Sequence, residues 1–274
     1  MQQKKYKFDI FSIFSTLWAH YELIKQFTKR EIASRYKGSL LGIVWSLITP
    51  IIMLFIYTFV FSEIFKSRWT VDNDNKLQFA LIVYCGLIIF NIFAEVTTRA
   101  PSLILNNPNY VKKVIFPLEI LPVVSMLSAL FQGSISYIIL IIGILINQGT
   151  ISISLILLPI LIIPFLLFLV GITWILAAFG VYFRDIGQII GLAIQGIMLL
   201  TPIFYPISVV PDKYLMIYHL NPLVYIVEDT RKVLIWGQFP SWYSLSLSFL
   251  IGFVFFVIGY NFFKRTKGGF SDVI

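Results

Sequence analysis

Long apolar runs without charge alternate with short polar segments along this chain of 274 residues. In the run from Gly38 to Phe65, residues 40–62 carry no charge. A bilayer core about 30 Å thick needs roughly 20 apolar residues in a helix, so this run is long enough to cross it. The pattern as a whole predicts an all-α integral membrane protein that forms one domain, residues 1–274, with six transmembrane helices. The expected spans are residues 39–62, 78–98, 118–146, 152–181, 187–209 and 243–263.

The segment ahead of the first span, residues 1–37, contains the pattern of an amphipathic helix. Residues 16–36 put apolar side chains on one helical face and polar ones on the other. We expect this helix to lie in the cytosolic interface of the membrane; an ordinary surface helix is the alternative. The apolar face consists of Leu17, Tyr21, Ile24, Phe27 and Ile32, opposite Glu22, Gln26, Lys29 and Arg30.

Residues 210–237, between the last two expected spans, are too charged to cross the membrane and too apolar for an ordinary loop. Asn221 and Pro222 are typical of a helix cap and the first helical residue. We therefore predict two short helices, near residues 212–219 and 222–235, that are re-entrant or interfacial on the outer side. A plain external loop is the alternative.

Two local features modify the expected spans. Pro159 and Pro164 in the fourth span remove helical hydrogen bonds and predict a kink, a tilt or a break there. At the end of the second span, Glu95 and Arg99 lie four residues apart in the order that favours a helical ion pair. That pair marks a membrane interface.

The distribution of positive charge orients the spans. With the N-terminus in the cytosol, the inner segments hold fifteen Lys and Arg residues and the outer segments hold six. The positive-inside rule then places both termini in the cytosol. The same asymmetry, together with anionic lipid, accounts for the net charge of +8 without a nucleic-acid partner.

The polar residues exclude several kinds of chemistry. Cys85 is the single cysteine, the two histidines are far apart in sequence, and no phosphate-binding loop of the GxxxxGK[ST] type occurs. The carboxylates fall near the ends of the expected spans, whereas an ion-coupled transporter would need carboxylates near the middle of the membrane. We therefore expect no catalytic residue, no metal and no ATPase motif, which leaves a pathway without its own energy source.

Aromatic residues make up 17% of the chain. Several of them fall within expected spans, where flat apolar rings could line a conduit and stack on sugar rings. Lipid-facing positions and interfacial belts are the alternative. The candidates are Trp45, Phe55, Tyr57, Phe59 and Phe61 in the first span, and Phe204 and Tyr205 in the fifth.

Six motifs, in this order, resemble the permease subunits of type-2 ATP-binding-cassette exporters for bacterial polysaccharides. The resemblance extends over nearly the whole chain and is densest in the segment TPIFYP, and the tail is similar to the branch that exports O-antigen of lipopolysaccharide. The motifs are Arg35 to Trp45 with Pro50 and Phe61, Asn107-Pro108 to Phe116-Pro117 with Leu121-Pro122, residues 182–186, residues 201–206, Asn221-Pro222-Leu223 followed by Arg231, and residues 270–274.

The resemblance implies a mechanism and partners. Two copies of the permease would join two ATPase subunits, which bind ATP and Mg, and would move polysaccharide linked to undecaprenyl diphosphate out of the cytosol. Residues near 17–34, 100–116 and 182–188 would face the ATPases. Arg184 and Asp185 would couple the subunits, and Arg35 and Lys37 would receive the carrier diphosphate. A charged helix cap is the alternative for the first pair, and membrane anchoring and topology for the second.

Other functions fit the sequence less closely. A permease for teichoic acid or capsular polysaccharide would use the same spans. A membrane enzyme of lipid-linked glycan metabolism would need catalytic groups in a large loop or at the membrane face, and the chain has no long loop of that kind. Glycan structure, chain length and the recognition of a terminal cap are not encoded in these patterns.

Overall fold

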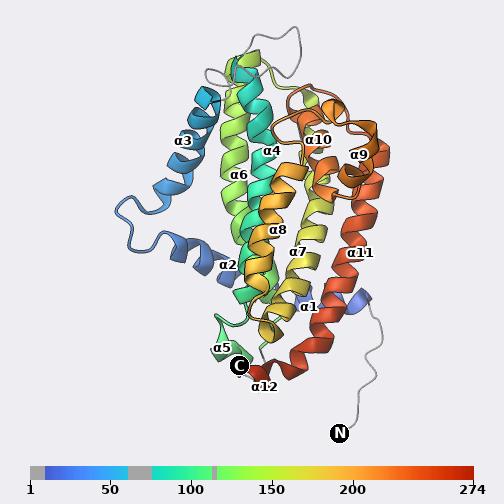
Figure 1. Ribbon diagram of the computed structural model, residues 1–274. Helices are drawn as coiled ribbons and strands as arrows, with labels where there is room; N and C mark the ends of the chain where they lie inside the picture. The colour runs from blue at the N-terminus through green and yellow to red at the C-terminus, as the bar shows by residue number, and fades with distance from the viewer. Residues whose placement is uncertain (1–9, 61–75, 113–115) are drawn as a thin grey trace.

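The computed structural model describes residues 10–60, 76–112 and 116–274, and every regular element in these ranges is a helix (Figure 1). Short 3₁₀ turns connect several of the α-helices. The α-helices are α1 Ile10–Ala19, α2 Tyr21–Arg35, α3 Trp45–Phe59, α4 Lys76–Arg99, α5 Pro108–Val111, α6 Ile120–Gln148, α7 Leu158–Tyr182, α8 Ile186–Leu200, α9 Asp212–His219, α10 Pro222–Leu234, α11 Trp242–Thr266 and α12 Phe270–Val273.

Among the described residues, five helical segments are long and apolar enough to cross a membrane, which confirms the all-α membrane fold. They are Gly42–Phe59, Leu77–Ser102, Ile120–Gln148, Ile153–Tyr182 and Trp242–Val273.

The expected fifth span is shorter than predicted. Helix α8 contains 15 residues, about 22 Å at helical rise, and ends at Leu200 instead of continuing to residue 209. The reason is local, because Pro202 disfavours a helical conformation at Thr201, whose backbone is extended. A continuous helix over residues 187–209 is therefore wrong.

Helix α4 is the most buried of the five long segments and lies at the centre of the bundle. It packs against α3, α6, α7, α8 and α10, whereas α3 stands at the edge of the bundle in Figure 1. Helices α7 and α11 pack closely together, because glycines at their contact let the two backbones approach. A Cβ atom at Gly259 would overlap the backbone of Gly171, and one at Gly252 would overlap that of Pro164.

Of the two prolines expected to bend the fourth span, Pro159 lies in the first turn of α7, where its missing N–H breaks no bond. Pro164 lies inside the helix. The expected span begins with a separate 3₁₀ turn, Ile153–Leu157, which is capped by Ser152.

The amphipathic segment forms two helices instead of one. Helices α1 and α2 meet at His20, whose ring is bonded to the carbonyl of Thr16 at 2.8 Å. Ile24 is buried, and Leu17 and Phe27 pack against the core, so part of the expected membrane-facing surface faces the protein. Helix α2 packs on α6.

The two short helices predicted before the last span are confirmed as α9 and α10. Asn221 caps α10, its side chain accepting from the N–H of Leu223 at 3.0 Å. Helices α9 and α10 lie at one end of the molecule, and α1, α5 and α12 lie at the other (Figure 1). The first described helix and the C-terminus therefore share one end.

Candidate functional site

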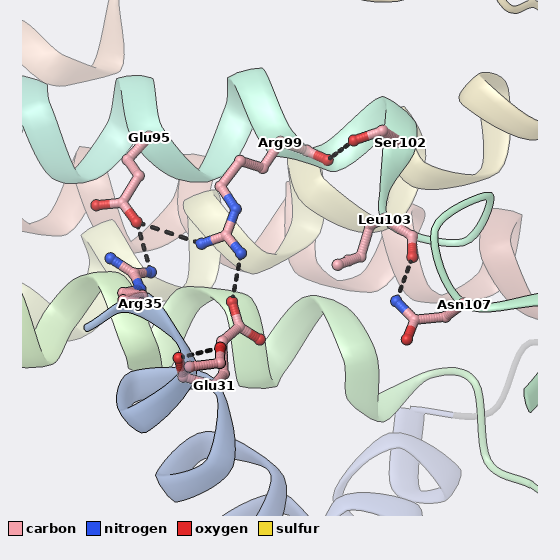
Figure 2. A network of polar contacts seen from close by, with 8 residues as sticks. Glu31, Arg35, Glu95, Arg99, Ser102, Leu103 and Asn107 are labelled. Atoms are coloured by element: carbon pink, nitrogen blue, oxygen red, sulfur yellow. Dashed lines mark hydrogen bonds and ion pairs between the residues drawn. The ribbon is translucent and has the colours of Figure 1, made fainter. Parts of the chain in front are cut away.

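Four charged side chains join α2 to the end of α4, as Figure 2 shows. Arg99 donates to Glu31 at 2.7 Å and to Glu95 at 3.4 Å, and Arg35 pairs with Glu95 at 2.5 Å. The pair of Glu95 and Arg99 was predicted from their spacing and is confirmed. We call Glu31, Arg35, Glu95 and Arg99 the inner ion network. Because the charges alternate along both helices, every member faces an opposite charge.

The members of the inner ion network remain partly accessible. The exposed fraction is 20% for the side chain of Arg35 and 30% for that of Glu95. The Nε of Arg35 is buried and has no hydrogen-bond partner in the described chain, so this guanidinium keeps one unused donor. Lys37 is exposed two residues further on. Arg35 can therefore exchange the carboxylate of Glu95 for another anion at a modest cost in free energy.

A polar cavity of about 140 Å³ lies directly beside Glu95, between α3, α4 and α6. On α4 it is lined by Tyr84, Asn91 and Glu95, which lie on one face of the helix. Gln132 of α6 also lines it, accepting from the hydroxyl of Tyr36 at 2.6 Å. Polar groups inside membrane spans are costly and concentrate where they have a function. The cavity and the inner ion network form one continuous polar region.

Arg184 and Asp185 occupy the tight turn between α7 and α8, and both are exposed. Asp185 is the N-cap residue of α8 but makes no capping hydrogen bond with its side chain. This disfavours the alternative that Arg184 and Asp185 serve only as a charged helix cap. Beside the turn, the hydroxyl of Tyr182 donates to the carbonyl of Thr266 at 2.8 Å. The turn is thus attached to the end of α11 while its two charges point outward to solvent.

Of the segments expected to face ATPases, α5 and the turn after α7 lie at the end of the molecule that holds α12, and α1 and α2 lie in the same half of the bundle (Figure 1). Gly180 of α7 packs directly on Pro101, because a Cβ atom there would overlap the carbonyl of Pro101. Lys267 forms an ion pair with the buried Glu119 at the start of α6. The first contact holds α7 against the segment after α4, and the second holds the end of α11 against the start of α6.

At the other end, the buried Arg231 of α10 fixes the segment after α8. Its guanidinium donates to the carbonyls of Pro202 at 2.6 Å, Ile203 at 2.7 Å and Ile82 at 3.1 Å, and pairs with Glu228 at 2.9 Å. We call this set the outer clamp. Burial lowers the pKa of Arg231, and the Glu228 carboxylate opposes that shift.

The described members of the aromatic set proposed to line a conduit lie in two separate places, on α3 and after α8. Trp45, Phe55 and Phe59 are exposed on α3, and Tyr57 is half-buried on the same helix. None of them lines the polar cavity. Phe61 lies outside the described residues. Phe204 and Tyr205 follow α8, where the hydroxyl of Tyr205 contacts that of Tyr218 at 2.8 Å.

Sequence reasoning missed three polar residues that the fold buries. Arg231 was named only within a motif of the family resemblance, Glu119 was included only among the carboxylates near span ends, and Asp229 was not singled out. Asp229 is buried and bonded to Lys232 at 3.0 Å and to the hydroxyl of Ser244. The available signal was the presence of charged residues, Asp229 and Arg231, in the otherwise apolar helix α10. Among the described residues, no cluster of three or more His, Cys, Asp or Glu side chains could hold a metal ion.

Comparison with known proteins places these features in a wider context. A family model described as ABC-2 type transporter matches residues 22–235. The matched region begins in α2 and ends after α10, so it contains the inner ion network, the polar cavity and the outer clamp.

Three relatives match over most of their length. An O-antigen export system permease protein RfbA of Klebsiella pneumoniae is 26% identical over 256 residues, 93% of this chain and 95% of the relative. The protein of the same name from Myxococcus xanthus is 24% identical over 261 residues, 94% of this chain and 97% of the relative. A polysialic acid transport protein KpsM of Escherichia coli is 25% identical over 242 residues, 87% of this chain and 91% of the relative.

Proposed function

Because the chain belongs to the ABC-2 type transporter family, we propose that it is the membrane permease of an ATP-driven exporter of O-antigen type polysaccharide. The single observation that carries the proposal is the match, over more than nine-tenths of the chain, to permeases named for O-antigen export. The substrate is polysaccharide linked to undecaprenyl diphosphate, and the membrane is the bacterial inner membrane. Residues 1–274 act as one permease domain with both termini in the cytosol.

The permease works with partner subunits. It carries no phosphate-binding loop, so ATP and Mg are bound by two ATPase subunits, and this subunit is not itself an enzyme. A second copy completes the assembly. Helices α3 and α8 support this arrangement, because they leave large apolar side chains exposed, including Phe55, Leu192 and Leu199. The exposed aromatics of α3 face glycan only in the assembled pair.

The carrier diphosphate binds at the inner ion network. Arg35 lies at the cytosolic end of the chain in this orientation, next to the exposed Lys37, and its guanidinium can hold phosphate oxygens bidentately. In the absence of substrate Glu95 neutralises Arg35. An arriving diphosphate takes the place of that carboxylate and gains the unused Nε donor as well. The polar cavity beside Glu95 then offers hydroxyl and amide groups to the first sugar.

Movement of the ATPases reaches the bundle through the turn between α7 and α8. Arg184 and Asp185 are exposed there, and the turn is short, so a push on it is transmitted along both helices. The contact between Gly180 and Pro101 passes the same displacement to the end of α4. The inner ion network lies in that part of α4.

Export of capsular polysaccharide is the second candidate, and the match to KpsM over 87% of the chain favours it. The two functions share the fold and the diphosphate chemistry of a lipid anchor, and they differ in the glycan.

The test is a transport assay with both glycans. The permease and its partner ATPases are reconstituted in proteoliposomes and supplied with lipid-linked O-antigen or lipid-linked capsular polysaccharide. We expect ATP-dependent translocation of the O-antigen substrate and no ATP hydrolysis by the permease alone. Translocation of the capsular substrate only would support the second candidate, and hydrolysis by the isolated permease at the rate of the complex would overturn the assignment.

A further inference from the structure

A large groove separates α1 and α2 from the first part of α6. Its volume is about 1170 Å³, its lining is mainly apolar, and none of the described residues that line it is acidic. Trp18 and Phe14 of α1 line it and are largely exposed, the former at 85%. The polar cavity beside Glu95 is a separate space, lined by other residues of α6. The groove is therefore distinct from the diphosphate site proposed above.

The dimensions of the groove match one leaflet of a membrane. Its lining on α6 extends from Val123 to Ser134, which is about 16 Å at helical rise. Half of a bilayer core is about 15 Å. Helix α6 begins at Ile120, only one turn before Val123. In the proposed orientation the groove thus starts at the cytosolic interface and reaches the middle of the membrane.

Positive charge is present on the α2 side of the groove. Lys25 and Lys29 both line it, lie one helical turn apart, and are exposed. Neither forms an ion pair with a carboxylate in the part of the chain that the structure describes. Thr28 lies on the same face, and its hydroxyl is buried without a hydrogen-bond partner among the described residues. Two ammonium groups and a hydroxyl are suited to a phosphate ester.

We propose that this groove holds an anionic glycerophospholipid of the inner leaflet, with an acyl chain along α6 and its phosphate between Lys25 and Lys29. The inference rests on the cytosolic position of α2 in the proposed function. A folded protein partner would need polar contacts along its rim, whereas this lining is apolar through the depth of a leaflet. Trp18 and Tyr21 lie where aromatic side chains prefer the membrane interface.

The bound lipid has a structural consequence. It fills the space between α2 and α6 and holds α2 against the bundle. Helix α2 carries Glu31 and Arg35 of the inner ion network, so the lipid positions the groups that receive the carrier diphosphate. Export activity is then sensitive to the anionic lipid content of the membrane.

Native mass spectrometry of the full permease with its ATPases tests the proposal. The purified complex in a neutral detergent receives phosphatidylglycerol or phosphatidylcholine with identical acyl chains. We expect preferential retention of phosphatidylglycerol. The double variant Lys25→Gln with Lys29→Gln should bind it about 30-fold more weakly, because each lysine near an anionic lipid contributes about 1 kcal/mol and 1.4 kcal/mol is a factor of ten.

Two further variants keep the test sharp. Lys213→Gln with Arg265→Gln removes the same charge at exposed positions outside the groove and should leave retention unchanged. Ser134→Trp narrows the groove from an exposed position on α6 and should lower retention of both lipids about tenfold without loss of folded protein. Equal retention by wild type and both groove variants would overturn the proposal.

Other occupants give different results. If inorganic phosphate displaces bound phosphatidylglycerol as effectively as added phosphatidylglycerol does, the groove is a free-anion site. If polyprenyl diphosphate displaces phosphatidylglycerol at equal stoichiometry, the groove is a site for the carrier. Protection of Lys25 and Lys29 from chemical labelling by the ATPases in lipid-free detergent, together with no retention of phosphatidylglycerol by the complex, indicates a protein interface. Each of these overturns the phospholipid assignment. Export measured in parallel separates the two proposals, because normal export without lipid retention refutes only this one.

Discussion

The inner ion network and the outer clamp both centre on an arginine, but they hold it in opposite ways. Arg35 faces carboxylates, is 20% exposed and keeps an unused donor. Arg231 is fully buried, and its donors are satisfied mainly by backbone carbonyls of two other segments.

This difference separates an exchangeable charge from a structural one. A carboxylate partner in partial contact with water can be replaced by a phosphate with little loss, because exposed ion pairs contribute only about 0.2–1 kcal/mol. Carbonyl partners in the interior cannot be replaced, because removing the arginine would leave them buried and unpaired. The comparison predicts that variants of the outer clamp affect folding and variants of the inner ion network affect export.

The largest effect is expected at the outer clamp. Arg231→Met should destabilise the protein by about 3–5 kcal/mol, since it leaves Glu228 and three carbonyls without their donor. Arg231→Lys should not restore stability, because one ammonium cannot reach carbonyls in three directions. Thermal unfolding in detergent measures this. Lys213→Met, at an exposed position on α9, serves as the control, and equal unfolding temperatures for the two variants would remove the clamp from the fold.

At the inner ion network we expect loss of export with little loss of stability. Arg35→Gln with Lys37→Gln should reduce export at least tenfold, while six Lys and Arg residues still precede the first span and maintain orientation. Arg35→Lys should restore little export, because an ammonium group cannot bind a phosphate through two parallel N–H donors as a guanidinium does. The readouts are proteoliposome transport and a protease-accessibility test of topology.

A charge exchange sharpens this test. In Arg35→Glu with Glu95→Arg, both contacts between α2 and α4 still join opposite charges, since Glu31 remains opposite Arg99. The exchange also puts like charges at 31 and 35 and at 95 and 99, each pair of which costs only about 0.2–0.5 kcal/mol. We expect near-normal accumulation but low export, because an acidic side chain now occupies the position that receives the diphosphate. Normal export by this variant would mean that Arg35 serves only to attach α2.

A smaller effect is expected at the turn after α7. Arg184→Ala with Asp185→Ala should leave insertion and assembly intact but lower export and the stimulation of ATP hydrolysis severalfold. Both side chains are exposed, so stability should change by less than about 0.5 kcal/mol. The matched control is Lys213→Ala with Asp212→Ala, an exposed pair on α9 at the opposite end. A normal ATPase response in the turn variant would exclude this turn from coupling.

The smallest effect is expected for Glu31→Gln. It removes one pair of the inner ion network but leaves Arg99 with Glu95, so the cost in stability should be about 0.3–1 kcal/mol. Export should fall by less than twofold. A loss as large as that of the variant at Arg35 and Lys37 would show that the network acts as one unit, and would erase the distinction between its members.

Sequence alone predicted what depends on local chemistry. Apolar length identified the long membrane helices, the pair Asn221-Pro222 identified the start of α10, and the spacing of Glu95 and Arg99 identified their ion pair. Each of these features follows from residues close together in the chain, where helical geometry fixes the distances. The resemblance of ordered motifs likewise pointed to the family that the comparison then matched.

Tertiary structure decided what depends on packing between segments far apart in sequence. Only the fold could pair Arg35 with Glu95, bury Arg231 against Ile82, or divide residues 16–36 into two helices with part of the apolar face against α6. It also buried Thr201 and the two residues after it, where the carbonyls of Pro202 and Ile203 accept from Arg231. The physical reason is that a buried polar group needs partners from wherever the chain supplies them, and sequence spacing does not contain that information.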